Sequence, residues 1–314
     1  MESRLNTLLR PSDRKISKFY CSKYQLSNSS LSTLAVLPNL SYLELPLFDQ
    51  KYSLPTPLGT KTFSSLRDLL IEYMPGNAIA AINFLTGIST DCLTCLKINF
   101  VSRFPMAELE RLALSVAKFR QLTELDLDFT KQEEWQSSQR AVGGHVLHPL
   151  CAIRDVEYLY LRSIPIMFSR EDLEQMASSW GKVKWLTLDT LHAGIALEDL
   201  TIFGGRCERM LRLDVQIKTV KSDWAWPPPH RHSADISILR HGLQSLDLLR
   251  SVFPPTAAEP VAIFLSDLFP EASIWHNHSD TDPQDRQDPA HPVAVIENIK
   301  AYKERLTESP QTRE

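Results

Sequence analysis

One short hydrophobic pattern recurs along most of the chain. It reads apolar-x-x-apolar-x-apolar, and its eight copies begin 26 to 34 residues apart. A weaker copy, Ile16/Phe19/Cys21, lies 24 residues before the first. Such regular spacing indicates an internal structural repeat. The copies are Leu40/Leu43/Leu45, Leu66/Leu69/Ile71, Leu93/Leu96/Ile98, Leu122/Leu125/Leu127, Val156/Leu159/Leu161, Val183/Leu186/Leu188, Met210/Leu213/Val215 and Leu243/Leu246/Leu248.

Each copy predicts a short strand, because its last two apolar residues alternate with mostly polar ones. Most intervals between copies carry an apolar stripe at helical spacing. Strand followed by helix, repeated, predicts parallel strands whose neighbours share one core. Ser29 or Ser30 is expected to cap the first helix, and Ser169, with Asp172, the helix that precedes Trp180. The stripes are Leu31/Leu34/Leu37, Ile79/Ile82/Leu85, Leu109/Leu112/Val116, Leu173/Met176/Trp180, Leu197/Leu200/Phe203 and Val261/Leu265/Leu268.

A strand-plus-helix repeat of this length that opens with L-x-x-L-x-L is the leucine-rich repeat pattern. The predicted fold is therefore α/β: a horseshoe-shaped solenoid with a concave parallel β-sheet and helices on the convex side. The usual Asn or Cys three residues after the last apolar position is absent, so the repeats are degenerate. Those positions hold Phe48, Met74, Val101, Thr130, Ile164, Leu191, Lys218 and Ser251.

The pattern also divides the chain into segments. Residues 1–14 form a lead-in that resembles the remnant of a preceding helix, and residues 15–276 hold about eight or nine repeats. An acidic, Pro-containing linker is expected at 277–291, and it should be flexible. A last short strand is expected near Ser273 to His276, and a capping helix and tail at 292–314.

Charge and cysteine content narrow the function classes. Lys plus Arg total 34 against 38 for Asp plus Glu in 314 residues, which gives a net charge of -4. That balance supplies no basic surface for nucleic acid or an anionic membrane. No apolar run approaches the roughly 18 residues of a membrane helix. The number of cysteines, five, is odd, and most of them lie far apart in the sequence, which disfavours a disulfide framework. We therefore expect a reducing compartment, cytoplasm or nucleus.

Candidate chemistry is sparse. Cys92 and Cys95 form a C-x-x-C pair with no second pair at zinc-site spacing. The sequence holds no nucleophile elbow and no phosphate-binding loop. We expect no catalysis, no cofactor and no resident metal. The remaining metal-ligating candidates are histidine pairs, His145/His148, His230/His232 and His276/His278, for which adventitious metal binding is the most we expect.

The most informative residues are those that flank the inward apolar positions, because the repeat places them on the concave face. Tyr158, Tyr160 and Trp185 are expected on adjacent strands, with Tyr160 open to solvent. Aromatic residues with arginine inside a polar surround have the composition of a protein-binding hot spot. The surrounding residues are expected to be Arg162, Asp189, Glu124, Asp126, Asp128, Arg212 and Asp214.

The acidic excess on this face predicts a partner with a basic segment, whose attraction salt would weaken. Asp126 and Asp128 are expected to act as exposed rim charges. A second candidate surface is the proline-rich loop that carries Trp224 and Trp226.

Several segments resemble the leucine-rich-repeat regions of fungal, mushroom-type F-box proteins. They are LPNLSYLEL, FSSLRDLLI, LTELDLDF, LQSLDLL and AEPVAIFLSDLFPEA, a helix that precedes the last short strand. In that family an N-terminal F-box docks the adaptor subunit of a cullin-RING ubiquitin ligase, and the repeats select the substrate. The resemblance implies substrate recognition for this chain. About fifteen residues precede the first weak repeat, so we expect the F-box itself to be missing.

Two other functions fit the same repeats. One is a leucine-rich-repeat scaffold unrelated to ubiquitin. The other is a regulator of a small GTPase, similar in architecture to the leucine-rich Ran GTPase-activating proteins. That function would need an arginine in a strand-to-helix loop, and Arg103 is the candidate.

Overall fold

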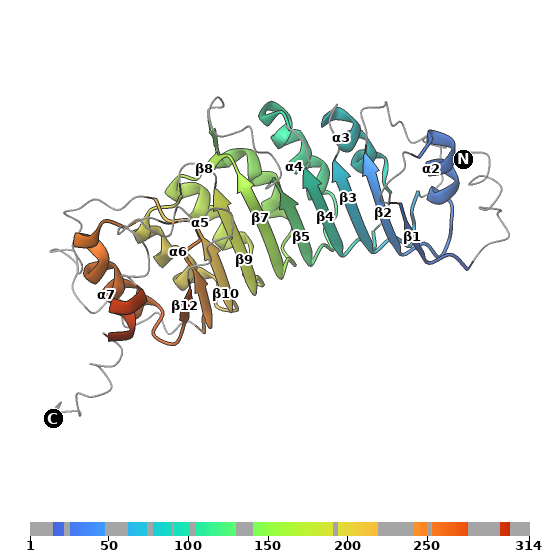
Figure 1. Ribbon diagram of the computed structural model, residues 1–314. Helices are drawn as coiled ribbons and strands as arrows, with labels where there is room; N and C mark the ends of the chain where they lie inside the picture. Colours follow the sequence, from blue (N-terminus) through green and yellow to red (C-terminus); the bar gives the residue numbers. More distant parts are fainter. Residues whose placement is uncertain are drawn as a thin grey trace. The chain divides into compact units, whose positions relative to one another are not determined.

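The computed structural model describes residues 15–21, 26–47, 62–73, 78–89, 91–100, 104–129, 141–190, 194–218, 242–249, 251, 253–275 and 296–301. The chain divides into two compact units, Met1–Pro165 and Ile166–Glu314. Both units are mixed α/β, and both are built from parallel strands with intervening helices (Figure 1).

The first unit contains a parallel sheet in which each strand pairs with its neighbours in the chain (Figure 1). The register aligns the copies of the repeat, so that Leu69 lies beside Leu43 and Leu96 beside Leu69. Equivalent apolar residues therefore stack along the sheet. The strands are β1 (Lys18–Tyr20), β2 (Tyr42–Leu47), β3 (Asp68–Tyr73), β4 (Cys95–Phe100), β5 (Glu124–Asp128) and β7 (Tyr158–Ile164).

Helices of the first unit cover one side of this sheet (Figure 1). The cap of the first helix is Ser27, whose Oγ accepts the N–H of Ser30 at 3.1 Å, so the expectation of Ser29 or Ser30 was wrong. A capping hydroxyl accepts from an N–H two or three residues ahead, and Ser27 has that position. The helices are α2 (Asn28–Ala35), α3 (Ala78–Gly87), η1 (Met106–Glu108), α4 (Leu109–Ala117) and η3 (Gly144–Ala152). A short strand, β6 (Val142–Gly143), precedes η3.

The second unit repeats the arrangement. Its parallel strands β9 (Trp185–Thr190), β10 (Arg212–Val215), β11 (Ser245–Asp247) and β12 (Ser273–Trp275) pair in chain order. The strand predicted near Ser273 is therefore confirmed. Its other elements are β8 (Ile166–Met167), α5 (Arg170–Ser179), η4 (Leu197–Asp199), α6 (Leu200–Arg206), η6 (Pro255–Ala257), α7 (Ala258–Leu268) and a helical segment at 296–301.

The core consists of the predicted repeat positions. Every apolar residue of the eight copies is at most 1% exposed. The six predicted helical stripes lie on helices except for Leu37 and Trp180, which follow the ends of α2 and α5, and Ile79 at the start of α3 is 38% exposed. Aromatic rings extend the core of the first unit, where Phe100 and Phe129 stack with centroids 4.2 Å apart. The period of the sequence pattern thus predicted the core correctly.

Positions that usually hold asparagine are filled in different ways. Ile164 is fully buried and simply adds apolar surface. Ser251 instead keeps a polar role, because its Oγ accepts the N–H of Ile217 at 2.7 Å and donates to the carbonyl of Leu248. A buried backbone N–H requires such a partner. At Ser251 a side chain of this repeat position therefore satisfies the backbone locally.

Ser169 begins α5 as predicted, and the structure gives a first testable expectation. Its Oγ accepts the N–H of Asp172 at 3.2 Å, while the Asp172 carboxylate accepts the N–H of Ser169 at 2.9 Å. Ser169→Ala should lower the free energy of unfolding by about 1 kcal/mol, as loss of a capping box does. Urea unfolding provides the measurement, with Ser179→Ala at the helix end as control. Equal losses in the two variants would contradict the cap's role.

Some predictions concern both units together or residues that the structure does not describe. That residues 15–276 form one curved solenoid concerns both units together and stays a prediction. The linker 277–291 lies outside the described residues. Of the C-terminal helix, residues 296–301 are described, and Ile299 is buried at 4% exposure. The buried Ile299 is consistent with a helix that packs through one face.

Candidate protein-binding interface

The candidate interface is the sheet face opposite the helices, which we call the open face. It is formed by the strand residues that alternate with the buried repeat positions. On β4, for example, Cys95, Lys97 and Asn99 are half-buried while their neighbours are fully buried. The alternation agrees with a strand that has one face in the core and one face outside it.

Charged residues on the open face of the first unit form two groups of ion pairs. Lys97 Nζ lies 2.6 Å from Glu124 Oε1. Arg162 reaches two carboxylates of the neighbouring strand, Asp126 at 3.5 Å and Asp128 at 3.7 Å. The position of these five side chains in the repeat predicts them on this face, and the parallel register brings them together. Lys97 was not among the expected binding residues.

The two tyrosines of this unit differ in burial. Tyr158 is 36% exposed, whereas Tyr160 is only 9% exposed. The expectation that Tyr160 is open to solvent was wrong. The guanidinium carbon of Arg162 lies 4.9 Å from the centroid of the Tyr160 ring, a cation–π contact that covers it. The Tyr160 ring therefore lies beneath the surface of the open face and contributes little to that surface.

Asp126 also departs from expectation. Its residue exposure is 6%, so it is not an exposed rim charge, and Asp128 keeps only 19% of its side chain exposed. Burial raises the pKa of Asp126 to about 6, although Arg162 and Lys97 act in the opposite direction. Asp128 and Glu124 raise the pKa further through like-charge repulsion. This burial could not be predicted from the strand pattern, because the period of a strand does not report how deeply a side chain is buried.

The raised pKa leads to a second expectation. A carboxyl whose pKa is higher in the folded protein than its ordinary 3.8 adds stability at low pH and loses it as the pH rises through 6. Asp126→Asn, which resembles the neutral form, should raise the free energy of unfolding at pH 7.5 by about 1 to 2 kcal/mol. The gain should vanish near pH 4.

Urea unfolding at several pH values checks this expectation. Asp68→Asn on β3 is the matched control, because it also removes one negative charge from the open face. A loss of stability in Asp126→Asn at pH 7.5 would contradict the assignment of Asp126 as an uncompensated charge.

Trp185 organises the open face of the second unit. Its Nε1–H donates to Asp214 Oδ2 at 3.0 Å, and the hydroxyl of Thr187 donates to the same oxygen at 3.0 Å. Arg212 Nε donates to the other oxygen of Asp214 at 2.8 Å, and its guanidinium lies 4.2 Å from the Trp185 ring. The indole is therefore held in one orientation by two neighbouring strands.

This network differs from the ion pairs of the first unit. Asp214 is buried at 5% exposure, yet both of its oxygens have hydrogen-bond donors. Trp185 and Asp189 are half-buried, and the side chain of Arg212 is 36% exposed. Thr187 lies on this face by its position in the repeat, but it was not among the expected binding residues. It could have been found from the register, which places Thr187 beside Asp214.

The remaining predicted candidates fall into two groups. A single aromatic cluster of Tyr158, Tyr160 and Trp185 would combine residues of both units and stays a prediction. Trp224 and Trp226 lie outside the described residues, as do Arg103 and the histidines of the two later pairs.

Potential metal ligands do not converge within the part of the chain that the structure describes, where no group of three or more His, Cys, Asp or Glu could hold an ion. Cys95 begins β4, while Cys92 is exposed. Burial, together with the charge of Glu124, raises the pKa of the Cys95 thiol to about 12. Cys95 is therefore protonated at neutral pH, which disfavours thiolate chemistry.

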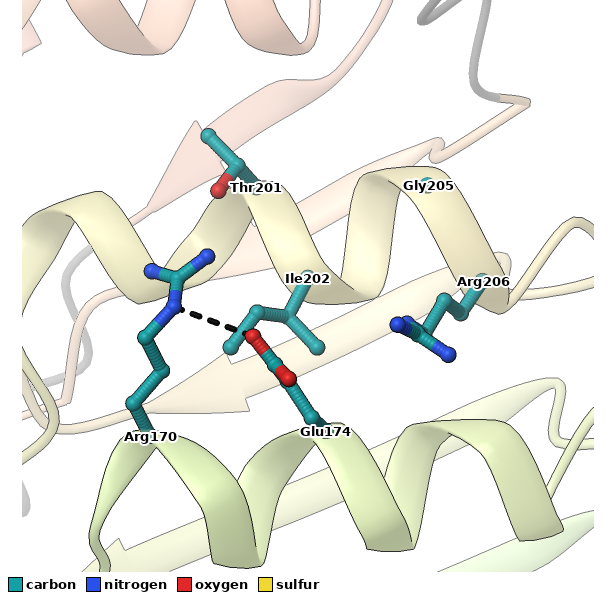
Figure 2. A pocket seen from close by; sticks show the side chains of 6 residues that line it. All are labelled: Arg170, Glu174, Thr201, Ile202, Gly205 and Arg206. Carbon is teal, nitrogen blue, oxygen red and sulfur yellow. Dashed lines mark ion pairs between the residues drawn. The ribbon is translucent and has the colours of Figure 1, made fainter.

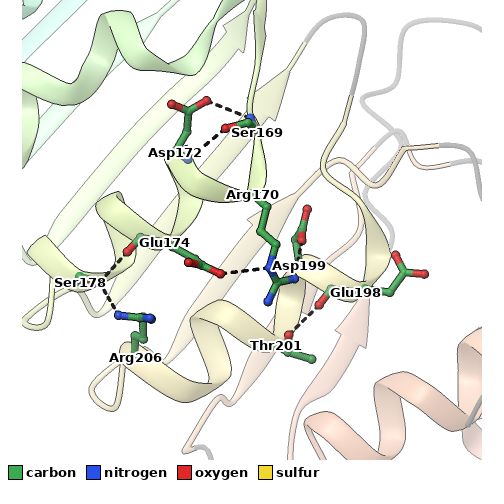
Figure 3. Close-up of polar contacts among 9 residues, drawn as sticks. All are labelled: Ser169, Arg170, Asp172, Glu174, Ser178, Glu198, Asp199, Thr201 and Arg206. Atoms are coloured by element: carbon green, nitrogen blue, oxygen red, sulfur yellow. Dashed lines mark hydrogen bonds and ion pairs between the residues drawn. The ribbon is translucent and has the colours of Figure 1, made fainter. Parts of the chain in front are cut away.

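A pocket of about 470 Å³ lies on the helical side of the second unit (Figure 2). It is lined by residues of α5 and α6. Arg170 is bonded there to Glu174 and to Asp199, each at 3.0 Å, and Arg206 donates to Ser178 at 2.6 Å (Figure 3). Both arginines bind the protein's own side chains. Their contacts connect α5 with η4 and α6. The four-residue spacing of Arg170 and Glu174 is visible in the sequence, whereas Asp199 is brought in by the fold.

Comparisons with known proteins identify a repeat protein among the solved structures. No protein-family model matches the chain, and no curated protein matches it. A leucine-rich-repeat protein of Leptospira interrogans is similar in structure, with 14% sequence identity and a TM-score of 0.41. The match covers 90% of this chain, and the chain spans about 63% of the length of that structure.

The described helices do not meet the requirements of a membrane span. None of them combines the length and the apolar character that crossing a bilayer requires.

Proposed function

We propose that this protein is a non-catalytic recognition module that binds a protein partner on the open face. The observation that carries the proposal is the ordered Trp185 in the second unit. Its indole is half-buried, stacked by Arg212 and hydrogen-bonded to Asp214. An aromatic anchor that is already ordered loses little conformational entropy on binding. Trp and Arg are also the residues most enriched in binding hot spots.

Cross-linking tests this proposal in the second unit. A photoreactive p-benzoylphenylalanine at Ser245, which pairs in register with Arg212, should form an adduct with a protein partner in cells. The same group at the exposed Gln175 on α5, on the helical side, is the matched control and should form none. Equal adducts from both positions, or none from Ser245, would contradict recognition through the open face.

The anchor itself can be tested in the same experiment. Trp185→Ala should weaken binding by on the order of 2 kcal/mol, about 30-fold, and the Ser245 adduct should fall accordingly. Thermal melting of the variant separates lost binding from lost folding. An unchanged adduct in a folded Trp185→Ala protein would place recognition elsewhere on the molecule.

A finer proposal concerns the process that the module serves. The segments that resemble fungal F-box proteins support substrate recognition for a cullin-RING ubiquitin ligase, in the cytoplasm or nucleus. In that case the chromosomally tagged protein should co-purify with a cullin and its adaptor subunit. Recovery of the cross-linked partner without any ligase subunit would favour a scaffold unrelated to ubiquitin.

A further inference from the structure

Asp126 is a buried carboxylate whose charge is poorly compensated. Among the described residues its Oδ1 has no hydrogen-bond partner, although the residue is 6% exposed. Its Oδ2 lies 3.5 Å from an Arg162 nitrogen. Buried charges ordinarily bind several donors, because their removal from water is costly. A polar group left in this state marks a position where a ligand would supply the missing interaction.

Neighbouring charges do not supply that interaction. Lys97 on β4 pairs closely with Glu124 at 2.6 Å. Arg162 on β7 is shared between Asp126 and Asp128, at 3.5 and 3.7 Å. Charge-assisted hydrogen bonds are ordinarily about 2.7 to 2.9 Å long, so Arg162 holds both carboxylates loosely. Its side chain is also 40% exposed, which leaves it accessible to a competing cation.

The charge balance of the open face indicates the sign of the ligand. Within the described strands of the first unit, three cations, Lys18, Lys97 and Arg162, oppose six acidic side chains of this face. A basic ligand is therefore complementary in charge. The acidic residues are Glu44, Asp68, Glu72, Glu124, Asp126 and Asp128.

We propose that a basic side chain of the protein partner replaces Arg162 beside Asp126 and Asp128, and that protonation of Asp126 releases it. This inference rests on the proposed function, because it names the chemistry of the partner and the regulation of its binding on the open face. Among the described residues, Tyr160 is a further titratable neighbour of Asp126, and it lies under Arg162 at the floor of this position.

The pH dependence follows from linkage. Burial, opposed by Arg162 and Lys97 and assisted by Asp128 and Glu124, raises the pKa of Asp126 to about 6. A bound cation favours the charged carboxylate and so lowers its pKa toward the ordinary value. The affinity should therefore fall as the pH decreases through 6. A return to the ordinary pKa in the complex corresponds to a roughly tenfold loss between pH 7.5 and pH 5.

Fluorescence anisotropy with a fluorescein-labelled octalysine peptide tests the inference on the full chain. Lysine stays charged over pH 5 to 8, so the probe itself does not titrate. We expect the Kd to rise about tenfold from pH 7.5 to pH 5. Asp126→Asn should bind more weakly at pH 7.5 and lose the inflection near pH 6. Asp68→Asn, the charge-matched control, should keep that inflection, which separates Asp126 from histidine titration and non-specific attraction.

Arg162→Gln distinguishes replacement from simple addition. If the peptide displaces Arg162, this variant should bind octalysine several-fold more tightly at pH 7.5. Weaker binding would overturn the replacement. Should either variant fail to fold, the wild type decides: the ¹³C carboxyl signal of Asp126 should titrate at lower pH when octalysine is present. An unchanged titration would overturn the inference.

Failure of this inference can be distinguished from failure of the proposed function. A Ser245 adduct together with an Asp126 titration that octalysine does not shift would reject the basic-ligand site alone. Absence of the adduct, with Asp126 responding to the peptide, would reject the Trp185 surface and leave the basic-ligand site.

Discussion

Leu159→Asp is expected to abolish cooperative unfolding. Leu159 is 1% exposed on β7 and pairs in register with Leu125, which is equally buried. The substitution places a charge among apolar side chains that offer no partner. A buried, unpaired charge costs more than about 4 kcal/mol, a large part of the stability of a domain. Urea unfolding followed by far-UV circular dichroism should show no sharp transition.

The adjacent residue is the matched control. Tyr158→Asp changes the same strand to the same charge, but Tyr158 is 36% exposed. It should keep a cooperative transition. A normally melting Leu159→Asp protein would refute the register of the repeats, since the two positions would then have exchanged faces.

Tyr160→Ala is the second substitution with a large expected effect. The ring is buried under Arg162, and its removal leaves a void beside Asp126. We expect the free energy of unfolding to fall by about 2 to 3 kcal/mol, somewhat less than for a fully buried aromatic residue. This is the opposite of what an exposed position would give.

Tyr158→Ala tests the same reasoning from the other side. It removes an identical ring from an exposed position, so we expect a loss below about 1 kcal/mol. The comparison uses the denaturant midpoint at constant slope. Similar losses in the two variants would show that exposure does not separate these tyrosines.

Tyr160 also shows where sequence reasoning ends. The strand period placed it on the open face together with Tyr158 and Arg162, and this assignment of faces is correct. The period says nothing about what covers a residue. Burial of Tyr160 comes from the long side chain two positions along the strand, which folds back over its ring. The core could be predicted to single residues because many copies of one pattern report the same register.

The side-chain networks could be predicted only in part. Trp185 and Arg212 are paired by the register, which the spacing of the repeats already contains. That Asp214 joins them by accepting from the indole depends on rotamers, which no sequence period encodes. The uncompensated oxygen of Asp126 is likewise a property of packing. For these residues, the chemical groups could be predicted from the sequence. Their hydrogen-bond partners, and whether their charges are compensated, could not.

Within each unit, the described strands of the parallel sheet pair in the order in which they are synthesised. A newly made strand therefore finds its partner in chain that has already left the ribosome, about one repeat upstream. Each added repeat can dock without waiting for a distant segment, as expected for a fold built from nearest-neighbour contacts. During translation, the apolar surface exposed at any moment is then limited to the growing edge.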